Sequence, residues 1–201
     1  MKGREKELEF FLAGSLEKVF SDKRPEEWKV GEKLCILRGG EIPAVQLVYY
    51  RKPGGRYPVP PRFRCEVAGF PAKVRMREVE LVPSAFPCFE RVDDNYLTTQ
   101  PGLFPDLLKP CEDGWITPRA GQYRALWIDF PDTSQVPAGE YRMEIRLTPE
   151  VEGVRGNGQS WKMDEEGKEG LTQEEPLSVI LEVSGEALPK QSLIHTEWFH
   201  A

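Results

Sequence analysis

Residues 123–148 contain two strand-like runs on either side of a turn-rich connection, and this stretch constrains the fold most strongly. In the second run, Tyr141, Met143, Ile145 and Leu147 alternate with polar side chains. Because successive side chains of a strand point to opposite faces, this period of two places the apolar groups on one face of a sheet. The stretch therefore predicts a pair of β-strands with one buried face.

The same pattern recurs along most of the chain. Alternating or short apolar runs occur at 8–12, 34–37, 44–50, 63–67, 74–81 and 177–183. The 18 glycines and 18 prolines supply the turns that many short strands need. We predict an all-β fold, a two-sheet antiparallel β-sandwich of the jelly-roll or immunoglobulin-like kind. Short helical turns are expected at 15–20 and 112–115, and a phase shift after Met76 predicts a β-bulge.

The chain length and the charge limit the possible classes of protein. With 201 residues, one large β-domain with a substantial core is expected, over residues 1–190. The net charge of −6 disfavours nucleic acid as a partner, because phosphate binding needs a basic surface. No apolar run is long enough to span a bilayer, and the first 20 residues do not resemble a signal peptide. We therefore expect neither a nucleic-acid nor a membrane partner, and a cytoplasmic location.

The cysteines and histidines do not predict a metal or redox centre. The four cysteines lack CxxC spacing, and Cys35 and Cys65 lie in strand-like runs that predict buried free thiols. His195 and His200, the only histidines, would point to opposite faces of a strand. We predict no metal ligand and no cofactor.

Two pairs of adjacent acids are candidates for a catalytic or metal-binding role. Asp164 and Glu165 lie in an acidic, glycine-containing stretch at 150–175, which is expected to be a long excursion between strands. Glycosidases use paired carboxylates, but a scaffold must set their separation, so these acids are interpreted as solvated charges. Asp93 and Asp94 are interpreted as turn residues. No catalytic residue is predicted.

Tryptophans provide the candidate sugar contacts. Trp115 and Trp161 fall in glycine-flanked stretches that are expected to be loops, whereas Trp127 lies in an apolar run that favours packing in the core. Exposure of Trp115 and Trp161 on one surface would favour a carbohydrate-binding module. Burial of both would favour a purely structural domain.

Several motifs, in their order along the chain, carry a resemblance to a known family. They are PGLFPDLLKP at 101–110, ALWIDF at 125–130 and PAGEYRMEIRL at 137–147, with SLEKVF at 15–20 and AVQLVYY at 44–50 earlier. Together they resemble the N-terminal β-sandwich domain of glycoside hydrolase family 123. The aromatic tail TEWFH at 196–200 is similar to the segment that leads, in that family, into a C-terminal (β/α)8 barrel.

The resemblance implies that catalysis belongs to a different domain of the natural protein. Characterised family members resemble β-N-acetylgalactosaminidases, which use substrate-assisted retention with an Asp-Glu pair that belongs to the barrel. Nothing in this sequence matches that pair. Residues 191–201 are expected to begin a linker into the barrel, and the chain is expected to be a non-catalytic accessory domain whose partner is that barrel. The alternatives are a stand-alone carbohydrate-binding module with glycans as partners, or an interaction domain that uses its edge strands.

Overall fold

The computed structural model describes residues 7–29, 31–54, 61–85, 98–154, 160–163, 171 and 175–187. These residues form twelve β-strands and no helix. The strands are β1 (Leu8–Gly14), β2 (Lys33–Arg38), β3 (Ala44–Arg51), β4 (Phe63–Ala68), β5 (Arg75–Ser84), β6 (Gly102–Pro110), β7 (Trp115–Ile116), β8 (Arg124–Asp129), β9 (Gly139–Pro149), β10 (Glu152–Val154), β11 (Ser160–Lys162) and β12 (Leu177–Ala187). The described part of the chain contains nothing helical that has the length and hydropathy of a membrane span.

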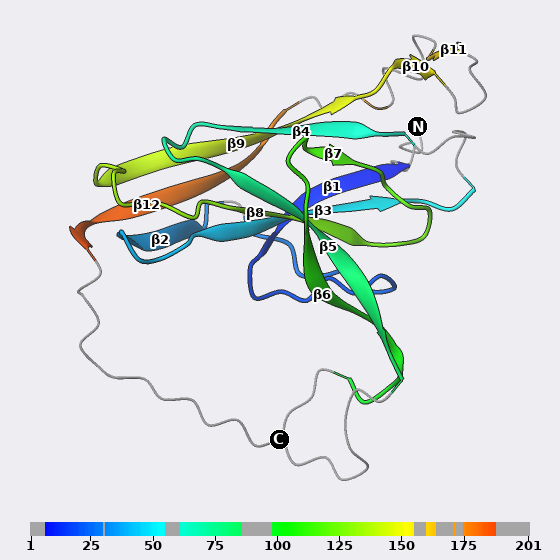
Figure 1. The fold of residues 1–201 in the computed structure, drawn as a ribbon, viewed down its shortest axis with the longest axis horizontal. Helices are drawn as coiled ribbons and strands as arrows, with labels where there is room; N and C mark the ends of the chain where they lie inside the picture. Colours follow the sequence, from blue (N-terminus) through cyan, green and yellow to red (C-terminus); the bar gives the residue numbers. More distant parts are fainter. Residues whose placement is uncertain are drawn as a thin grey trace, which may run out of the picture.

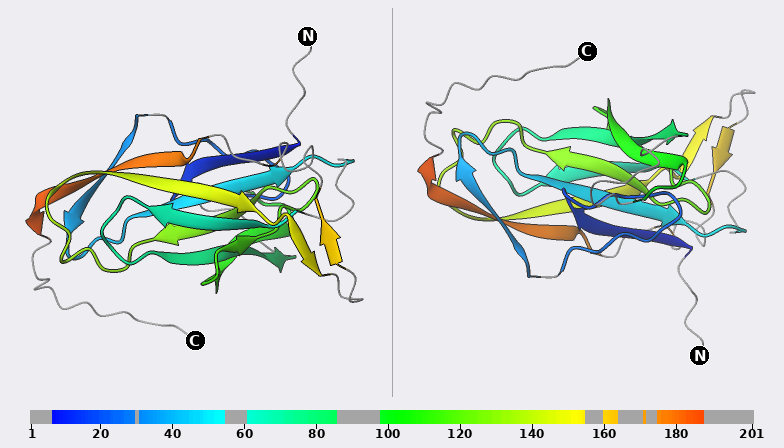
Figure 2. Two further views of the ribbon diagram at one scale, coloured as in Figure 1. Left: turned by 90° about the horizontal axis from the view of Figure 1, so that it is seen from above. Right: turned by 90° about the horizontal axis from the view of Figure 1, so that it is seen from below.

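Ten of the strands build two five-stranded sheets. The first sheet has the order β1-β3-β8-β5-β6, and the second sheet has the order β2-β12-β9-β4-β7. Figures 1 and 2 show the two sheets as layers, with the strands of one lying over those of the other. The predicted all-β sandwich is confirmed.

One strand pair differs from the antiparallel prediction. β2 lies parallel to β12, with Cys35 opposite Glu182, whereas every other pair in the two main sheets is antiparallel. After β1 the chain leaves the first sheet and joins the second sheet at its edge, beside the last described strand. An alternating sequence pattern carries no information about strand direction, so this pairing was not predictable from it.

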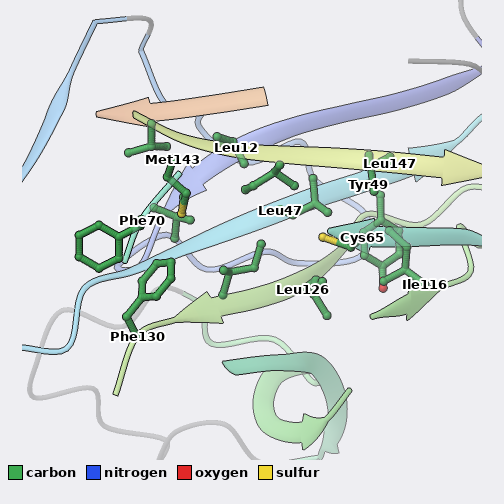
Figure 3. Close-up of a cluster of buried hydrophobic side chains, with 14 of the residues drawn as sticks. Leu12, Leu47, Tyr49, Cys65, Phe70, Ile116, Leu126, Phe130, Met143 and Leu147 are labelled. Atoms are coloured by element: carbon green, nitrogen blue, oxygen red, sulfur yellow. The ribbon is translucent and has the colours of Figure 1, made fainter. Parts of the chain in front are cut away.

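The main core lies between the two sheets (Figure 3). Its fully buried side chains include Leu47, Tyr49, Leu126, Met143 and Ile145. β9 buries Met143, Ile145 and Leu147 as its alternation predicts, and β12 likewise buries alternate apolar residues. The period of two therefore gave the inward face of both strands correctly.

A second, smaller apolar cluster covers the outer face of the first sheet. It contains Phe11, Ala13, Val19, Val48, Val79 and Ala125. Val19 comes from the connection after β1, and Gln46 binds the same connection by donating from Nε2 to the carbonyl oxygens of Gly14 and Glu17 at 2.8 and 2.7 Å. The connection therefore shields this face of the sheet, and the burial of both faces explains why β3 is apolar on consecutive positions.

Neither predicted helical turn forms a helix. Ser15 and Leu16 make a turn, and the residues that follow extend so that Val19 reaches the second cluster. At 112–115, the Asp113 carboxylate accepts a hydrogen bond from the Trp115 backbone N–H at 3.3 Å, and Gly114 has φ of 68°. A local side-chain bond and a left-handed glycine both favour a turn over a helix.

The predicted bulge occurs on a neighbouring strand. Glu80 pairs with Leu107 and Leu81 pairs with Pro105, so Asp106 of β6 is the inserted residue. The apolar phase of β5 shifts for another reason. Met76 packs against the main core, whereas Val79 belongs to the second cluster on the opposite face. Placing the bulge in β5 was therefore wrong.

The β5–β6 ribbon extends beyond the rest of its sheet. The β5 ladder to β8 runs from Arg75 to Val79, while its ladder to β6 continues to Ser84. In Figure 1 the far part of the ribbon runs away from the sandwich at the lower right. Leu103 and Leu107 of β6 are 46% and 58% exposed.

The stretch at 150–175, predicted as a long connection between strands, contains two short strands. β10 and β11 pair antiparallel in a separate two-stranded sheet beyond the end of β9 (Figure 1), and Leu171 is buried. Asp164, Glu165, Asp93 and Asp94 lie outside the described residues. So do both histidines and the segment 191–201.

Candidate functional site

Trp115, the first predicted sugar contact, lies in a strand. It belongs to β7, where its backbone pairs with Arg64 of β4, so its assignment to a loop was wrong. The ladder forms because Ile116, its neighbour, is buried opposite Phe63. The Trp115 ring is partly buried, and the Arg62 guanidinium carbon lies 4.8 Å from its centroid. One side of this indole therefore already has a cationic partner.

Trp161, the second predicted sugar contact, also lies in a strand. Its backbone in β11 pairs with Gly153 of β10. Its side chain is outside what the structure describes, so its contacts remain a prediction. Trp115 and Trp161 thus belong to different sheets.

A cluster that sequence reasoning did not single out lies on the outer face of the first sheet. It is built on Asp129, the last residue of β8, and consists of Asp129, Trp127, Arg75 and Arg77; we call it the Asp129 cluster. Asp129 pairs with Arg75 and Trp127 pairs with Arg77 across the β5–β8 ladder, so all four side chains lie on one face. The sequence signal was a Trp-x-Asp run and an Arg-x-Arg run in two separate strands.

Asp129 is the buried centre of this cluster, with 2% of its side chain exposed. Arg75 donates from Nε to Oδ1 at 2.9 Å and from Nη2 to Oδ2 at 3.0 Å. Trp127 donates from Nε1 to Oδ2 at 3.0 Å, and Arg77 donates from Nη2 to the same oxygen. Burial opposes ionisation of Asp129, but the hydrogen bonds from Arg75 and Trp127 and the charge of Arg77 outweigh it and lower its pKa.

A different polar cluster lies on the inner face of the same sheet. Arg124, which is 4% exposed, donates from Nη2 to Glu80 Oε2 at 2.9 Å and lies 3.8 Å from Glu78. The Tyr49 hydroxyl donates to Glu78 Oε1 at 3.1 Å. Burial, and then the charge of Glu78, raise the pKa of Tyr49. These groups pair with one another at the edge of the core, although the buried Arg124 Nε has no acceptor among the described residues, and we interpret this cluster as structural.

The described thiols differ in exposure. Cys65 is buried as predicted, and burial raises its pKa to about 12. Cys35 is exposed, so the prediction of a buried thiol was wrong there. It lies on the outer face of β2, at the edge of the second sheet, with its Sγ 3.8 Å from Glu182 Oε2. The run at 34–37 is apolar, but Cys35 points away from the core, on the same face as its exposed neighbour Glu182.

Surface grooves also occur among the described residues. One of about 670 Å³ lies where β2 and β12 end and β9 begins, and includes Cys35, Glu140 and Glu182. The other, of about 380 Å³, includes Trp28 and four glutamates. No group of three or more metal-ligating side chains occurs in the described part of the chain.

The fold defines the molecule as a β-sandwich. No family model matches the sequence, and no curated protein matches it. Among solved structures, the chain is similar to a family 123 glycoside hydrolase from Clostridium perfringens, which was studied for glycolipid glycan hydrolysis. The TM-score is 0.55 at 9% identity, over 90% of this chain and 28% of that chain.

The chain therefore spans 28% of the length of that enzyme, and at 9% identity the likeness shows the fold alone. The N-terminal domain of PorA matches over 89% of this chain and 100% of that domain, at 8% identity. Its TM-score of 0.31 is too low to carry an argument.

Proposed function

We propose that this chain is the non-catalytic β-sandwich domain of a glycoside hydrolase of the family 123 type, which supports a catalytic barrel in the same natural protein. The observation that carries the proposal is the structural likeness over 90% of this chain to 28% of a family 123 enzyme. Four of the five motifs that suggested the family fall on β3, β6, β8 and β9, and the fifth, at 15–20, follows β1. In such an enzyme the Asp-Glu pair that acts on the sugar belongs to the barrel, so no chemical step is assigned to this chain.

The β5–β6 ribbon offers a surface on which such a barrel would pack. A two-stranded ribbon gains little stability by itself, yet this one extends past its sheet with Leu103 and Leu107 exposed. Leu107 pairs with Glu80 and Leu103 with Pro83, three positions further along β5, so the two leucines lie on opposite faces of the ribbon. A barrel that closes around the ribbon would cover both, for roughly 2–4 kcal/mol of apolar burial. Pro105 and Pro110 lie in the same strand. Because proline lacks a backbone N–H, it limits further pairing at this edge and favours docking through side chains.

The test uses the natural protein as its gene encodes it, with p-nitrophenyl β-N-acetylgalactosaminide as substrate. We expect hydrolysis by the natural protein and none by residues 1–190 alone. In the natural protein, the double change Leu103→Ser and Leu107→Ser should lower the melting temperature of the barrel. The control Ile42→Ser changes a residue that is 52% exposed away from the ribbon, and should leave that temperature unchanged.

Two results would overturn the proposal. One is a natural reading frame that ends at Ala201. The other is a longer natural protein that leaves β-N-acetylhexosaminides intact while it is fully folded. An unchanged melting temperature in the double leucine variant would overturn the docking surface.

A further inference from the structure

We propose that the Asp129 cluster binds an anionic saccharide, a sugar that carries a carboxylate or a sulfate. This site is separate from the β5–β6 docking surface and does not depend on the proposed accessory role. Three observations carry it: an unbalanced positive charge, guanidinium groups that are held in place, and a partly exposed indole beside them.

The charge comes from two arginines that share one acid. Arg75 and Arg77 both pair with Asp129, and no second acid pairs with either of them among the described residues. The neighbours on this face of the sheet are Ala44, Gln46 and Pro110, which are uncharged. The amide nitrogen of Gln46 is already engaged by backbone carbonyls. One positive charge is therefore unbalanced, in a chain whose net charge is −6.

The two guanidinium groups are held in place for binding. Each guanidinium group has five N–H donors, and Arg75 uses two of them in hydrogen bonds to Asp129. Arg75 has 45% of its side chain exposed, so its remaining donors reach solvent. Arg77 is 22% exposed and adds positive charge beside Arg75, although its own Nε is buried and out of reach of a ligand. The planar N–H donors of a guanidinium group match the oxygens of a carboxylate or sulfate. An anion would therefore gain paired hydrogen bonds from a group that is already ordered.

The indole argues for a sugar rather than a free anion. Trp127 packs in part against the second apolar cluster and is otherwise exposed, and its Nε1–H bond to Asp129 fixes the orientation of the ring. A fixed aromatic ring offers an apolar surface to the face of a pyranose, while the arginines take its charged substituent. The ligand class is therefore a uronic acid or a sulfated sugar.

The second sheet contains a similar group of two arginines and one acid, which can serve as a control. Arg142 and Arg146 also share one acid, Glu144, on its outer face. There the acid has 32% of its side chain exposed and the arginines 68% and 62%. No aromatic side chain is joined to these three by a described contact. This trio has the same charges without a buried anchor, so it serves as the control.

The experiment titrates the 201-residue chain and follows the Trp127 indole N–H resonance, assigned with the Trp127→Phe variant. The probes are methyl β-glucuronide, methyl β-glucoside, methyl glucoside 6-sulfate and sodium acetate. We expect a saturable shift with the glucuronide or the sulfated sugar, and none with the glucoside. Arg75→Gln should weaken binding by about tenfold or more, because it removes a charge-assisted pair. Arg146→Gln should leave binding unchanged.

Three outcomes would overturn the proposal. One is the absence of a saturable shift up to about 50 mM of either charged sugar, well above a millimolar dissociation constant. The second is an equal response to acetate, which would mean an anion site without sugar recognition. The third is an equal loss in Arg146→Gln and Arg75→Gln, which would mean non-specific attraction. Arg75 is exposed at one end of a strand, and Arg77 still pairs with Asp129 in its absence, so the variant should fold.

Discussion

Arg75 binds Asp129 through two parallel hydrogen bonds, Nε to Oδ1 at 2.9 Å and Nη2 to Oδ2 at 3.0 Å. This contact joins the first residue of β5 to the last residue of β8. The two residues are 54 positions apart in sequence and face each other only because the β5–β8 ladder has this register. The Asp129 cluster is therefore a consequence of strand pairing.

The lowered pKa of Asp129 makes stability depend on pH. A carboxyl group whose folded-state pKa lies below its ordinary value of 3.8 stabilises the fold above that value. This contribution is lost as the pH falls through the lower, folded-state pKa. We expect Asp129→Asn to be less stable than the parent chain at pH 7, and the difference to shrink below pH 3.8. Urea denaturation from pH 7 to below pH 3.8 measures the difference in unfolding free energy between the two chains. A difference that does not change with pH would contradict this account.

Arg124 should matter far more to stability than an exposed arginine. Its side chain is 4% exposed and neutralises Glu78 and Glu80 at the edge of the core. Arg124→Met would leave Glu78 without its cation and Glu80 with only the more distant Lys109 at 3.9 Å, and should cost about 3 kcal/mol of unfolding free energy. The control Arg142→Met, on the outer face of the second sheet, should cost less than about 0.5 kcal/mol. Similar losses in the two variants would show that the inner cluster contributes little.

Thiol reactivity should separate Cys35 from the buried thiols. In a Cys88→Ser background, Cys35 should react with a disulfide reagent at pH 8, because it is exposed. Cys65 should stay unreactive until the chain unfolds, since it is buried and its pKa is about 12, so the thiolate is scarce. Cys111 is also buried, and burial raises its pKa. Fast labelling of more than one thiol in the native chain would argue against this packing.

Two glycines with positive φ should respond differently to substitution by alanine. At Gly69, with φ of 85°, an added Cβ would lie 2.1 Å from the Arg142 carbonyl oxygen. We expect Gly69→Ala to cost about 4 kcal/mol or more, because backbone must move to make room. At Gly54, with φ of 76°, nothing lies within 4 Å, so Gly54→Ala should cost only about 1 kcal/mol of left-handed strain. Chemical denaturation of both variants gives the comparison, and equal costs would mean that the Gly69 contact relaxes easily.

Much of the fold could be predicted from local patterns. The alternation at 141–147 and 177–183 gave the inward faces of β9 and β12, since side-chain direction in a strand depends only on position along it. The same rule failed for Cys35, because a short apolar run does not show which of its side chains face out of the sandwich. It failed for the β5 phase shift as well, because a local pattern does not show that both faces of a sheet are covered.

Local sequence patterns were enough to predict the class of fold and most of the buried faces, since these follow from the spacing of apolar side chains and from glycine and proline. The parallel β2–β12 pair, the second apolar cluster and the Asp129 cluster arise only in the folded chain. Each of these depends on which strands become neighbours and in what register. That choice is made by packing between distant segments, and a local period of two leaves it open.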